Sequence, residues 1–487
     1  MIKRLLDNFY LKTTLIIVAL EVASFFTFLF PSIHNLLFIL VTIFTAFLIY
    51  KKTEYGIYLF ITELIIGGQG YLFSYEFDNF KISFRLVIFL LLFSIGMTRF
   101  LRKKDWSISK NKISITLLVL FTFIFISLIT SLAKHKPLQD IFLDINGYLF
   151  FGLGIIFLTT KIPNLNNLKN NKIIKILLTA SSWLAIKTIL SLSLFSYGIA
   201  KVGDSLIYKW LRDTRVGEIT QMNYPFYRIF FQSHIYNLIS IFLILTVVFL
   251  YTKKYNKKQI VFFLFLLFLN FSAILISQSR SFWVSGFITL VFFLFSLIFI
   301  FKQKWQKILV FIFLIPTILV LNNLFISLVL QKNFNLISNR IVETSSNTSS
   351  VSSRSSQITP LLKQIKQAPI FGNGFAQKVN YTSDDPRIKN EQNPEGNYET
   401  YSFELGYLDI ILKIGILGFL SYIFLLVFLM LKNFKLLKEK EWLVFTILGL
   451  LIIIMTDAFT PYLNHPLGIG FILITILLYQ NNKKEII

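Results

Sequence analysis

The fold is decided by stretches such as Ile260 to Phe301, which reads IVFFLFLLFLNFSAILIS, then QSRS, then FWVSGFITLVFFLFSLIFIF. Two apolar runs of membrane length are separated here by a few polar residues. Backbone polar groups find no partners in hydrocarbon, so a crossing segment of roughly 20 apolar residues must be helical. The stretch therefore predicts two transmembrane helices joined by a tight turn.

Runs of the same kind recur along the whole chain. More than half of the 487 residues are apolar, Phe occurs 55 times, and only 15% are charged, which is too apolar for a soluble globular protein. The runs lack the alternation of barrel strands. We therefore predict an all-α polytopic membrane bundle of about 12–14 helices, with spans near 13–31, 33–50, 56–75, 82–99, 113–133, 145–161, 173–197, 234–252, 260–277, 282–301, 308–330, 403–431, 442–457 and 464–480.

Charge alternates between the connecting segments. More than half of the 48 Lys and Arg residues lie at the N-terminus and in short segments near 51–52, 99–112, 161–175, 253–258, 302–307, 432–440 and 483–484. By the positive-inside rule these segments and both termini are predicted to be cytoplasmic. The basic Met1–Lys12 and apolar Thr13–Phe30 are interpreted as a first helix, not a cleaved signal. Topology thus explains most of the net charge of +24, and no nucleic-acid partner is needed.

One long polar stretch, Gln331 to Ser402, interrupts the apolar pattern and falls on the predicted outer side. It divides the chain into a bundle of about eleven spans (1–330), the outer loop (331–402) and about three C-terminal spans (403–487). The Ser-rich part, 343–356, is expected to be irregular, and 357–368 has the apolar spacing of a short amphipathic helix. The following APIFGNGF contains Gly372 and Gly374, which permit a tight turn and close backbone approach to a ligand.

Arginines on the predicted outer side are the candidate anion-binding residues. Arg280 lies in the SQSRS turn, Arg340 follows a long span, Arg354 lies in the Ser-rich part, and Arg228 precedes another span. Guanidinium groups bind phosphate bidentately, so several that converge would suit a diphosphate at headgroup level. Alternatively, they bind lipid phosphates or pair with local acids.

Glu404 is the acidic candidate, because it is placed at the start of the predicted span after the loop. An ionisable residue at the membrane boundary, beside a polar cavity, is a functional candidate by default. Asp409 and Lys413 are spaced i and i+4 and can pair with each other, whereas Glu404 has no such local partner. Alternatively, Glu404 merely favours the dipole of a helix N-terminus.

Taken in order, these segments resemble the O-antigen ligase and polymerase superfamily of membrane glycosyltransferases. The resemblance rests on SQSRSFWVS, Arg340, SRSSQITPLLKQIKQAPIFGNGF and ELGYLDIILKIGILGF, and it covers about 270–420. A weaker similarity extends to YRIFFQSHIYNLIS, which contains Arg228. Many ligases of this family carry a histidine where this chain has Glu404.

The resemblance implies a GT-C-like glycosyltransferase on the outer face of the inner membrane. Its donor would be a glycan on undecaprenyl diphosphate, and its acceptor a sugar hydroxyl of another glycan or of lipid A core. Arg280 and Arg354, with Arg340 or Arg228, would hold the diphosphate, and Glu404 would take the acceptor proton, with Arg280 and Glu404 as the catalytic pair. Membrane lipids and a regulator of chain length are further expected partners.

Three alternatives remain open at this stage. Glu404 in place of histidine favours a polymerase of surface polysaccharide over a ligase, and a lipid-linked oligosaccharide flippase would also have about fourteen spans. Glu21, Glu63 and Lys187 within apolar runs, with GGQG at 67–70, are compatible with a transporter's polar cavity. No metal or other cofactor is expected, because the four histidines lack ligand spacing and the chain has no cysteine.

Overall fold

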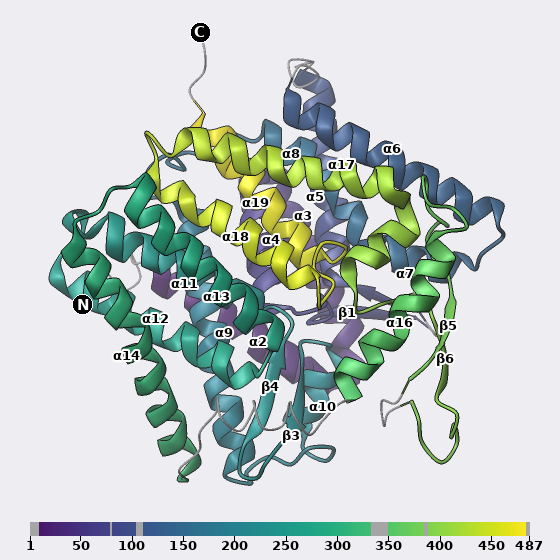
Figure 1. The fold of residues 1–487 in the computed structure, drawn as a ribbon, viewed down its shortest axis with the longest axis horizontal. Helices are drawn as coiled ribbons and strands as arrows, with labels where there is room; N and C mark the ends of the chain where they lie inside the picture. Colours follow the sequence, from purple (N-terminus) through teal and green to yellow (C-terminus); the bar gives the residue numbers. More distant parts are fainter. Residues whose placement is uncertain (1–8, 78–79, 104–110, 333–348, 384–387, 484–487) are drawn as a thin grey trace.

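A computed structural model describes residues 9–77, 80–103, 111–332, 349–383 and 388–483. Figure 1 shows a bundle of long helices, and the described residues also form three two-stranded sheets, of which β3–β4 and β5–β6 lie toward the edge of this view. The helices of the first half are α2 (Phe9–Leu29), α3 (His34–Lys51), α4 (Thr53–Ile66), α5 (Phe84–Lys103), α6 (Lys112–Ala133), α7 (Leu138–Leu149), α8 (Leu153–Thr159), α9 (Lys172–Ser196) and α10 (Leu206–Asp213). Those of the second half are α11 (His234–Leu250), α12 (Lys257–Ser277), α13 (Arg280–Phe295), α14 (Trp305–Leu330), α16 (Ser349–Ile365), α17 (Gly406–Leu436), α18 (Val444–Asp457) and α19 (Pro466–Asn482).

The predicted polytopic helical fold is confirmed. Within the described ranges, ten helices are long and apolar enough to cross a membrane, with α7 and α8 together forming one of them. The shorter apolar helices α11 and α19 lie among them, and so do α4 and α18. Every predicted span falls on one of these helices. The predicted span 56–75 was too long, because α4 ends at Ile66 and the glycines of 67–70 form a turn.

Burial separates central from peripheral helices. Nearly every residue of α11 and α19 is buried, and α9 is also largely enclosed. In contrast, α2, α3 and α14 expose most of their apolar side chains. A helix that is apolar all round gives no directional signal for its neighbours, and small or polar residues at the contacts then decide the packing. Asn237 on α11 illustrates this, because its side-chain amide donates to Asn270 on α12 at 2.9 Å.

Two buried ion pairs account for charges inside the apolar runs. Lys187 on α9 contacts Glu21 on α2 at 2.7 Å, and Arg85 on α5 contacts Glu63 on α4 at 2.6 Å. Each pair joins two helices and leaves its members almost completely buried. These residues therefore stabilise helix–helix contacts in the bundle. Because they are paired and buried, they no longer favour the alternative of a transporter with a polar cavity.

The three antiparallel hairpins were not predicted from the sequence. They are β1 (Ser74–Phe77) with β2 (Phe80–Ser83), β3 (Gly217–Gln221) with β4 (Tyr227–Phe231), and β5 (Val379–Thr382) with β6 (Asn397–Thr400). The β3–β4 and β5–β6 hairpins lie in segments predicted to be outside the membrane, whereas β1 and β2 overlap the ends of the predicted spans 56–75 and 82–99. We call this part of the bundle the hairpin end.

Loops predicted to share a side contact one another. At the hairpin end, the Tyr462 hydroxyl donates to the Gln232 carbonyl at 2.7 Å. At the opposite end, which we call the basic end, the Lys440 amine donates to the Asn166 carbonyl at 3.3 Å, and Asn481 donates to Thr160 at 3.2 Å. The helix α19 begins at the hairpin end and finishes at the basic end. The alternation of charge along the sequence thus corresponds to two opposite ends of the fold.

Candidate active site

The SQSRS turn joins α12 to α13 as predicted. Gln278 adopts a left-handed conformation with φ of 49°, and α13 begins at Arg280. Arg228 on β4 donates through Nε to the carbonyl of Ser277 at 2.9 Å. The turn and the hairpin therefore bring Arg228 and Arg280, which are far apart in the sequence, to one place at the hairpin end.

An apolar cavity lies directly beyond Arg280 along α13. It has a volume of about 200 Å³ and is lined only by apolar side chains and Gly286, from α11, α12, α13 and α14. Phe282 and Trp283, the second and third residues after Arg280, belong to its wall. A cationic turn and an apolar cavity are thus adjacent, as recognition of an amphiphile with an anionic head requires.

The loop between α18 and α19 contacts the same turn. The hydroxyl groups of Ser281 and Thr460 lie 3.3 Å apart, and those of Ser285 and Thr456 lie 3.0 Å apart. Asp457, the last residue of α18, is completely buried. This loop was not predicted to be part of a site, although its sequence, DAFTPYLNHP, is a polar interruption between two apolar runs.

Asp457 links this loop to the start of α17. Its Oδ1 accepts the backbone N–H groups of Tyr462 and Leu463, both at 2.7 Å, whereas its Oδ2 has no hydrogen-bond partner among the described residues. A Cβ atom built on Gly406 would lie 2.4 Å from that oxygen. Gly406 therefore has to be glycine for α17 to begin against this carboxylate, two residues after Glu404.

Arg354 and Glu404 form an ion pair of 2.7 Å between Nε and Oε2. The side chain of Arg354 is 31% exposed and that of Glu404 is 45% exposed, so a substrate can reach both. The prediction that Glu404 lies in the first turn of a span was wrong, because α17 begins at Gly406 and Glu404 precedes it. The partner of Glu404 is Arg354, which lies on α16. Arg354 therefore pairs with an acidic residue, as the alternative interpretation of the arginines predicted.

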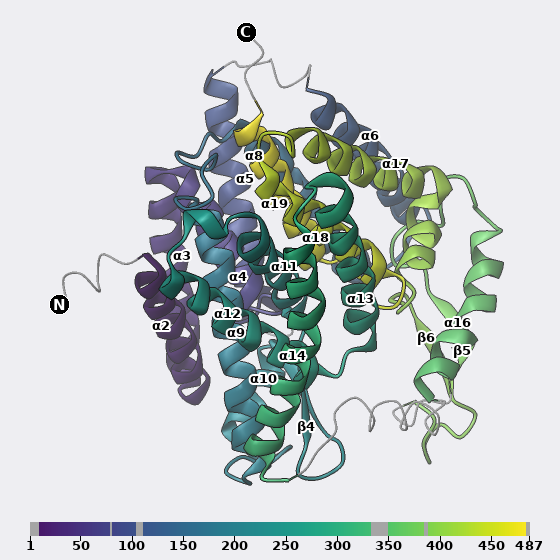
Figure 2. The same cartoon turned by 60° about the vertical axis from the view of Figure 1, so that its left-hand side comes forward.

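A small separate core positions this ion pair. Leu361 of α16, Val379 and Tyr381 of β5, Phe403, and Leu412 of α17 form a buried apolar cluster. Figure 2 shows α16 and the β5–β6 hairpin together at one edge of the bundle. Helix α16 begins at Ser349, earlier than the predicted 357, and includes part of the Ser-rich stretch that was expected to be irregular. The cluster packs α16 against the start of α17 and so holds Arg354 next to Glu404.

The APIFGNGF turn is inserted into a break in α17. Gly415 has φ of 72° and ψ of 176°, so the helix is interrupted there before it continues to Leu436. The predicted span 403–431 runs across this break, which its continuous hydropathy did not indicate. Backbone hydrogen bonds run from Asn373 to Leu412, from Gly374 to Lys413, from Ile416 to Pro369 and from Leu417 to Ile370, at 2.7–3.3 Å.

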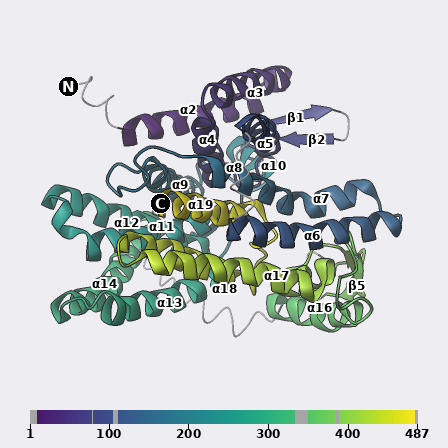
Figure 3. The same ribbon diagram turned by 90° about the horizontal axis from the view of Figure 1, so that it is seen from above.

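This pairing explains the two glycines of the turn. A Cβ atom on Gly372 would lie 2.3 Å from the carbonyl oxygen of Lys413, and one on Gly374 would lie 2.6 Å from the hydroxyl of Ser131 on α6. The close backbone approach that these glycines permit is thus to α17 and α6. Figure 3 shows α6 and α17 running alongside each other, with α16 near one end of α17.

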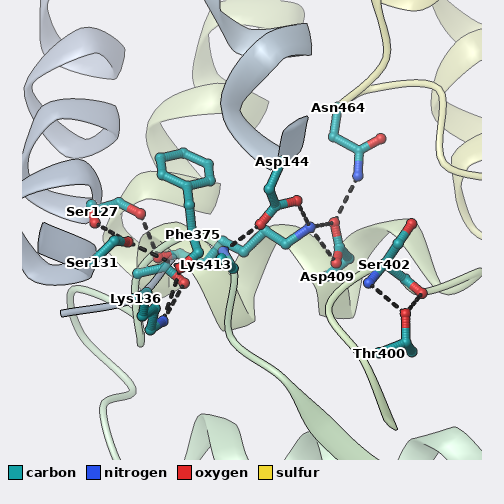
Figure 4. A network of polar contacts seen from close by, with 12 residues as sticks. Ser127, Ser131, Lys136, Asp144, Phe375, Thr400, Ser402, Asp409, Lys413 and Asn464 are labelled. Carbon is teal, nitrogen blue, oxygen red and sulfur yellow. Dashed lines mark hydrogen bonds and ion pairs between the residues drawn. The ribbon is translucent and has the colours of Figure 1, made fainter. Parts of the chain in front are cut away.

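A buried network of charges lies next to the break (Figure 4). Lys413 contacts Asp409 at 2.7 Å, as the i, i+4 spacing predicted, and it also contacts Asp144 of α7 at 2.5 Å. Asn464 donates to Asp409 at 2.6 Å, and the backbone N–H of Ala376 donates to Asp144 at 2.7 Å. The network therefore joins α7, α17, the loop before α19 and the inserted turn.

Lysines of the α6–α7 loop complete the turn's hydrogen bonding. The Lys136 amine donates to the carbonyls of Asn373, Gly374 and Phe375 at 2.9–3.3 Å, and Lys134 donates to Asn373 at 3.2 Å. Burial is the main cause that lowers the pKa of Lys136 to about 8. The exposed carbonyls of a non-helical segment are thus satisfied by protein groups, as a membrane setting demands.

The histidines have local structural roles. The Nδ1 atom of His465 accepts the N–H of Leu467 at 3.2 Å and caps α19. Burial, with a smaller contribution from Arg85, lowers the pKa of His465 to about 3, which keeps the imidazole neutral. His234 lies 2.8 Å from the Thr188 hydroxyl. Among the described residues, no group of three or more His, Cys, Asp or Glu could hold a metal ion.

Of the predicted site residues, the structure brings Arg354 and Glu404 into direct contact and places Arg228 and Arg280 at one turn. The loop that contains Asp457 and Thr460 connects these two parts. Arg340 lies outside the described residues. Gly372 and Gly374 belong to the inserted turn, which packs against α17 at its break.

The comparisons with known proteins agree with this location. The model of the family described as O-antigen ligase matches residues 262–423, about a third of the chain. The match begins within α12 and ends within α17, so it contains Arg280, Arg354, Glu404 and the inserted turn. No curated protein matches the sequence. Over residues 262–423, this polytopic membrane protein is thus similar to the O-antigen ligase family, which supports the resemblance to the O-antigen ligase and polymerase superfamily.

Proposed function

We propose that this protein polymerises oligosaccharide repeat units linked to undecaprenyl diphosphate. The observation that carries the proposal is that Arg228 lies against the turn of Arg280, that Arg354 and Glu404 pair just before α17, and that the loop after α18 contacts both places, mostly within the family-matched region. The family itself supports a membrane role in glycan ligation or polymerisation. The identity of the donor, the identity of the acceptor and the roles of the individual residues are part of the proposal.

The donor is recognised in two parts. Its diphosphate is bound by Arg280 at the N-terminus of α13 and by Arg228, since guanidinium groups match phosphate oxygens in charge and geometry. The beginning of its lipid chain occupies the apolar cavity lined by Phe282 and Trp283. A soluble nucleotide sugar would leave that cavity unused, which favours a lipid-linked donor.

The reaction then needs a base and a stabilised leaving group. The acceptor hydroxyl oxygen attacks the anomeric carbon of the donor sugar, the bond from that carbon to the phosphate oxygen breaks, and the diphosphate leaves with the electron pair. Glu404 takes the hydroxyl proton, which contributes roughly 10²–10⁴-fold in typical enzymes. Arg280 and Arg228 stabilise the charge on the diphosphate.

Arg354 orients Glu404 through their ion pair. Its Nε is engaged with the carboxylate, and a guanidinium carries four further N–H donors that can face the diphosphate. Asp457 acts as a positioning residue, because it fixes the loop after α18 against Gly406 and therefore against the segment that carries Glu404.

The direct test measures surface glycan in a deletion strain complemented with variants. Arg280→Ala and Glu404→Ala should abolish the long glycan ladder at normal protein levels. The matched controls are Arg212→Ala and Glu399→Ala, whose side chains form exposed ion pairs with Asp213 and Lys378 at the same end. Parental ladders from the two site variants would refute the assignment.

The same gels distinguish polymerase from ligase. Loss of the ladder with single repeats still attached to their acceptor indicates a polymerase, which Glu404 in place of histidine favours. Long chains retained on the lipid carrier indicate a ligase, which the description of the matching family favours. Repeats trapped inside the cell would indicate a flippase. A partner that regulates chain length is expected only for the polymerase.

The hairpin end is proposed to face outward from the bacterial inner membrane, with both termini cytoplasmic. The reason is the concentration of Lys and Arg at the basic end. Because the chain contains no cysteine, single introduced cysteines report orientation directly. A membrane-impermeant maleimide should label Tyr398→Cys, at an exposed position of β6, in intact cells, and should label Lys254→Cys only after permeabilisation. The reverse pattern would contradict this orientation.

A further inference from the structure

A second pocket lies at the basic end, far from the candidate active site. It has a volume of about 520 Å³ and is formed where α3 and α5 end, where α4 begins and where the chain leaves α8. We call it the basic recess and define it by the residues used below: Lys51, Lys52, Thr53, Glu54, Arg99 and Lys161.

The position of α19 shows how far apart the two sites are. This helix begins beside Asn464, which contacts Asp409 of the buried network, and ends where Asn481 donates to Thr160 in the wall of the recess. A helix of 17 residues is roughly 25 Å long. Figure 2 shows the same separation, with α8 toward the top and with α10 and β4 near the bottom.

The recess carries a strong excess of positive charge. Lys51, Lys52, Arg99 and Lys161 line it, and Glu54 is its only acidic lining residue among the described residues. Lys52 lies 3.6 Å from Glu54, so the described lining of the recess has four cationic side chains and one carboxylate. The positive-inside rule explains cationic residues that are spread over the connecting loops. In the basic recess, by contrast, four cationic side chains surround one cavity.

Arg99 holds the walls of the recess together. Its guanidinium donates to the Thr53 hydroxyl at 2.6 Å and to the Tyr50 carbonyl, so α5 is tied to the end of α3 and the start of α4. Both of these partners are neutral, and these contacts therefore leave the positive charge of Arg99 uncompensated. The cavity is thus shaped by the same side chain that makes it attractive to an anion.

Exposed apolar side chains lead up to the rim of the recess. On α3, Phe44, Phe47 and Tyr50 are 60%, 58% and 75% exposed, and on α5 Leu101 is 53% exposed. In a membrane protein this surface faces lipid. A small soluble anion would use only the cavity, whereas a phospholipid would place its phosphate in the cavity and its acyl chains along the aromatic side chains of α3.

We propose that the basic recess binds the phosphate headgroup of an anionic phospholipid, with its acyl chains against α3 and α5. Two phosphates in one headgroup suit the four cations best, so cardiolipin should bind more tightly than phosphatidylglycerol. This site is independent of the glycan chemistry at the hairpin end, and its occupancy does not depend on whether the protein is a polymerase or a ligase.

The test is native mass spectrometry of the delipidated full-length protein in detergent, with cardiolipin, phosphatidylglycerol and phosphatidylcholine added separately. Lys51→Gln/Lys52→Gln should weaken cardiolipin binding roughly 25-fold, since each charge near a membrane surface is typically equivalent to about fivefold. Both lysines are exposed, so the fold should be retained. The matched control, Lys435→Gln/Lys438→Gln, removes two exposed charges at the same end but outside the recess, and should change binding by less than about twofold.

Two further measurements distinguish binding of a lipid phosphate from binding of free phosphate. Inorganic phosphate at millimolar concentration should not displace cardiolipin, and cardiolipin should raise the thermal unfolding temperature of the parental protein and of the control but not of Lys51→Gln/Lys52→Gln. Equal losses in both double variants would mean diffuse surface charge and would overturn the proposal. Displacement by inorganic phosphate, or equal binding of phosphatidylcholine, would also overturn it.

Discussion

The break in α17 offers the sharpest test of how the active site is supported. Gly415→Ala places a methyl group where φ is 72° and ψ is 176°, a combination that residues with a side chain rarely adopt. The added Cβ would lie 2.2 Å from the carbonyl oxygen of Ile370 and 2.6 Å from the backbone nitrogen of Gly372. The substitution therefore acts on the backbone itself and on the inserted turn at the same time.

The expected cost follows from this geometry. Real Cβ contacts are not shorter than 3.0 Å, so the turn must move by at least about 0.8 Å from its 2.2 Å approach. That displacement strains all four backbone hydrogen bonds between the turn and α17, which are 2.7–3.3 Å long. At about 1 kcal/mol for each bond, with about 1–3 kcal/mol of backbone strain, the loss of stability should be about 5 kcal/mol or more.

Gly198→Ala is the matched control. Gly198 also has a positive φ, 70°, but an added Cβ there would meet nothing within 4 Å, so only the conformational cost of about 1–2 kcal/mol remains. Unfolding by SDS in mixed micelles should separate the two variants by about 3 kcal/mol, and only Gly415→Ala should lose the glycan ladder. Equal stability of the two variants would refute the conclusion that the inserted turn stabilises the break in α17.

Three other predictions concern the site and its supports. Glu404→Gln should lower glycan joining at least about 100-fold. Adding Arg354→Ala should lower it by a smaller factor than Arg354→Ala does in the parental protein, while stability changes by about 1 kcal/mol or less because the pair is partly exposed; additive losses would argue against their acting together. Lys136→Met should cost about 2–3 kcal/mol because three carbonyls lose a charged donor, whereas Lys134→Met, which affects one carbonyl, should cost about 1 kcal/mol; equal unfolding free energies would contradict this. The folded pKa of His465, about 3, lies below its unfolded value of about 6.5, so the unfolded chain binds the extra proton and stability falls as the pH drops through 6.5 toward 3. Between pH 7.5 and 5.0 the parental protein should lose about 2 kcal/mol more than His465→Asn, which keeps a capping side chain without a titrating ring, and identical pH profiles would contradict this prediction.

The sequence predicted the parts of the candidate site that consist of a local pattern. Arg280 could be placed at a turn because two apolar runs leave only a short connection between them. The pair of Asp409 and Lys413 followed from helical spacing. In contrast, the partner of Glu404 could not be predicted, because Arg354 lies 50 positions away and meets it only through the packing of α16 on α17.

Asp457 was missed for a related reason. A carboxylate at the end of an apolar run resembles an ordinary boundary residue, and only the fold shows that it is buried against Gly406 with one oxygen lacking a partner among the described residues. The role of Gly415 was also hidden, because the apolar run around it is continuous and hydropathy does not report a change of backbone direction. The inserted turn supplies the missing hydrogen bonds from a distant segment.

The sequence by itself determined that this protein is a polytopic helical membrane protein, roughly where its helices lie, and which ends of those helices share a side. These properties depend on hydrophobicity and charge, which are summed along the chain and are nearly independent of tertiary contacts. The tertiary structure alone decided which polar groups meet. Helices that are apolar all round can pack in many ways, so the positions of Arg354, Asp457 and the break at Gly415 are fixed by buried polar contacts between distant segments, and these have no periodic signature in the sequence.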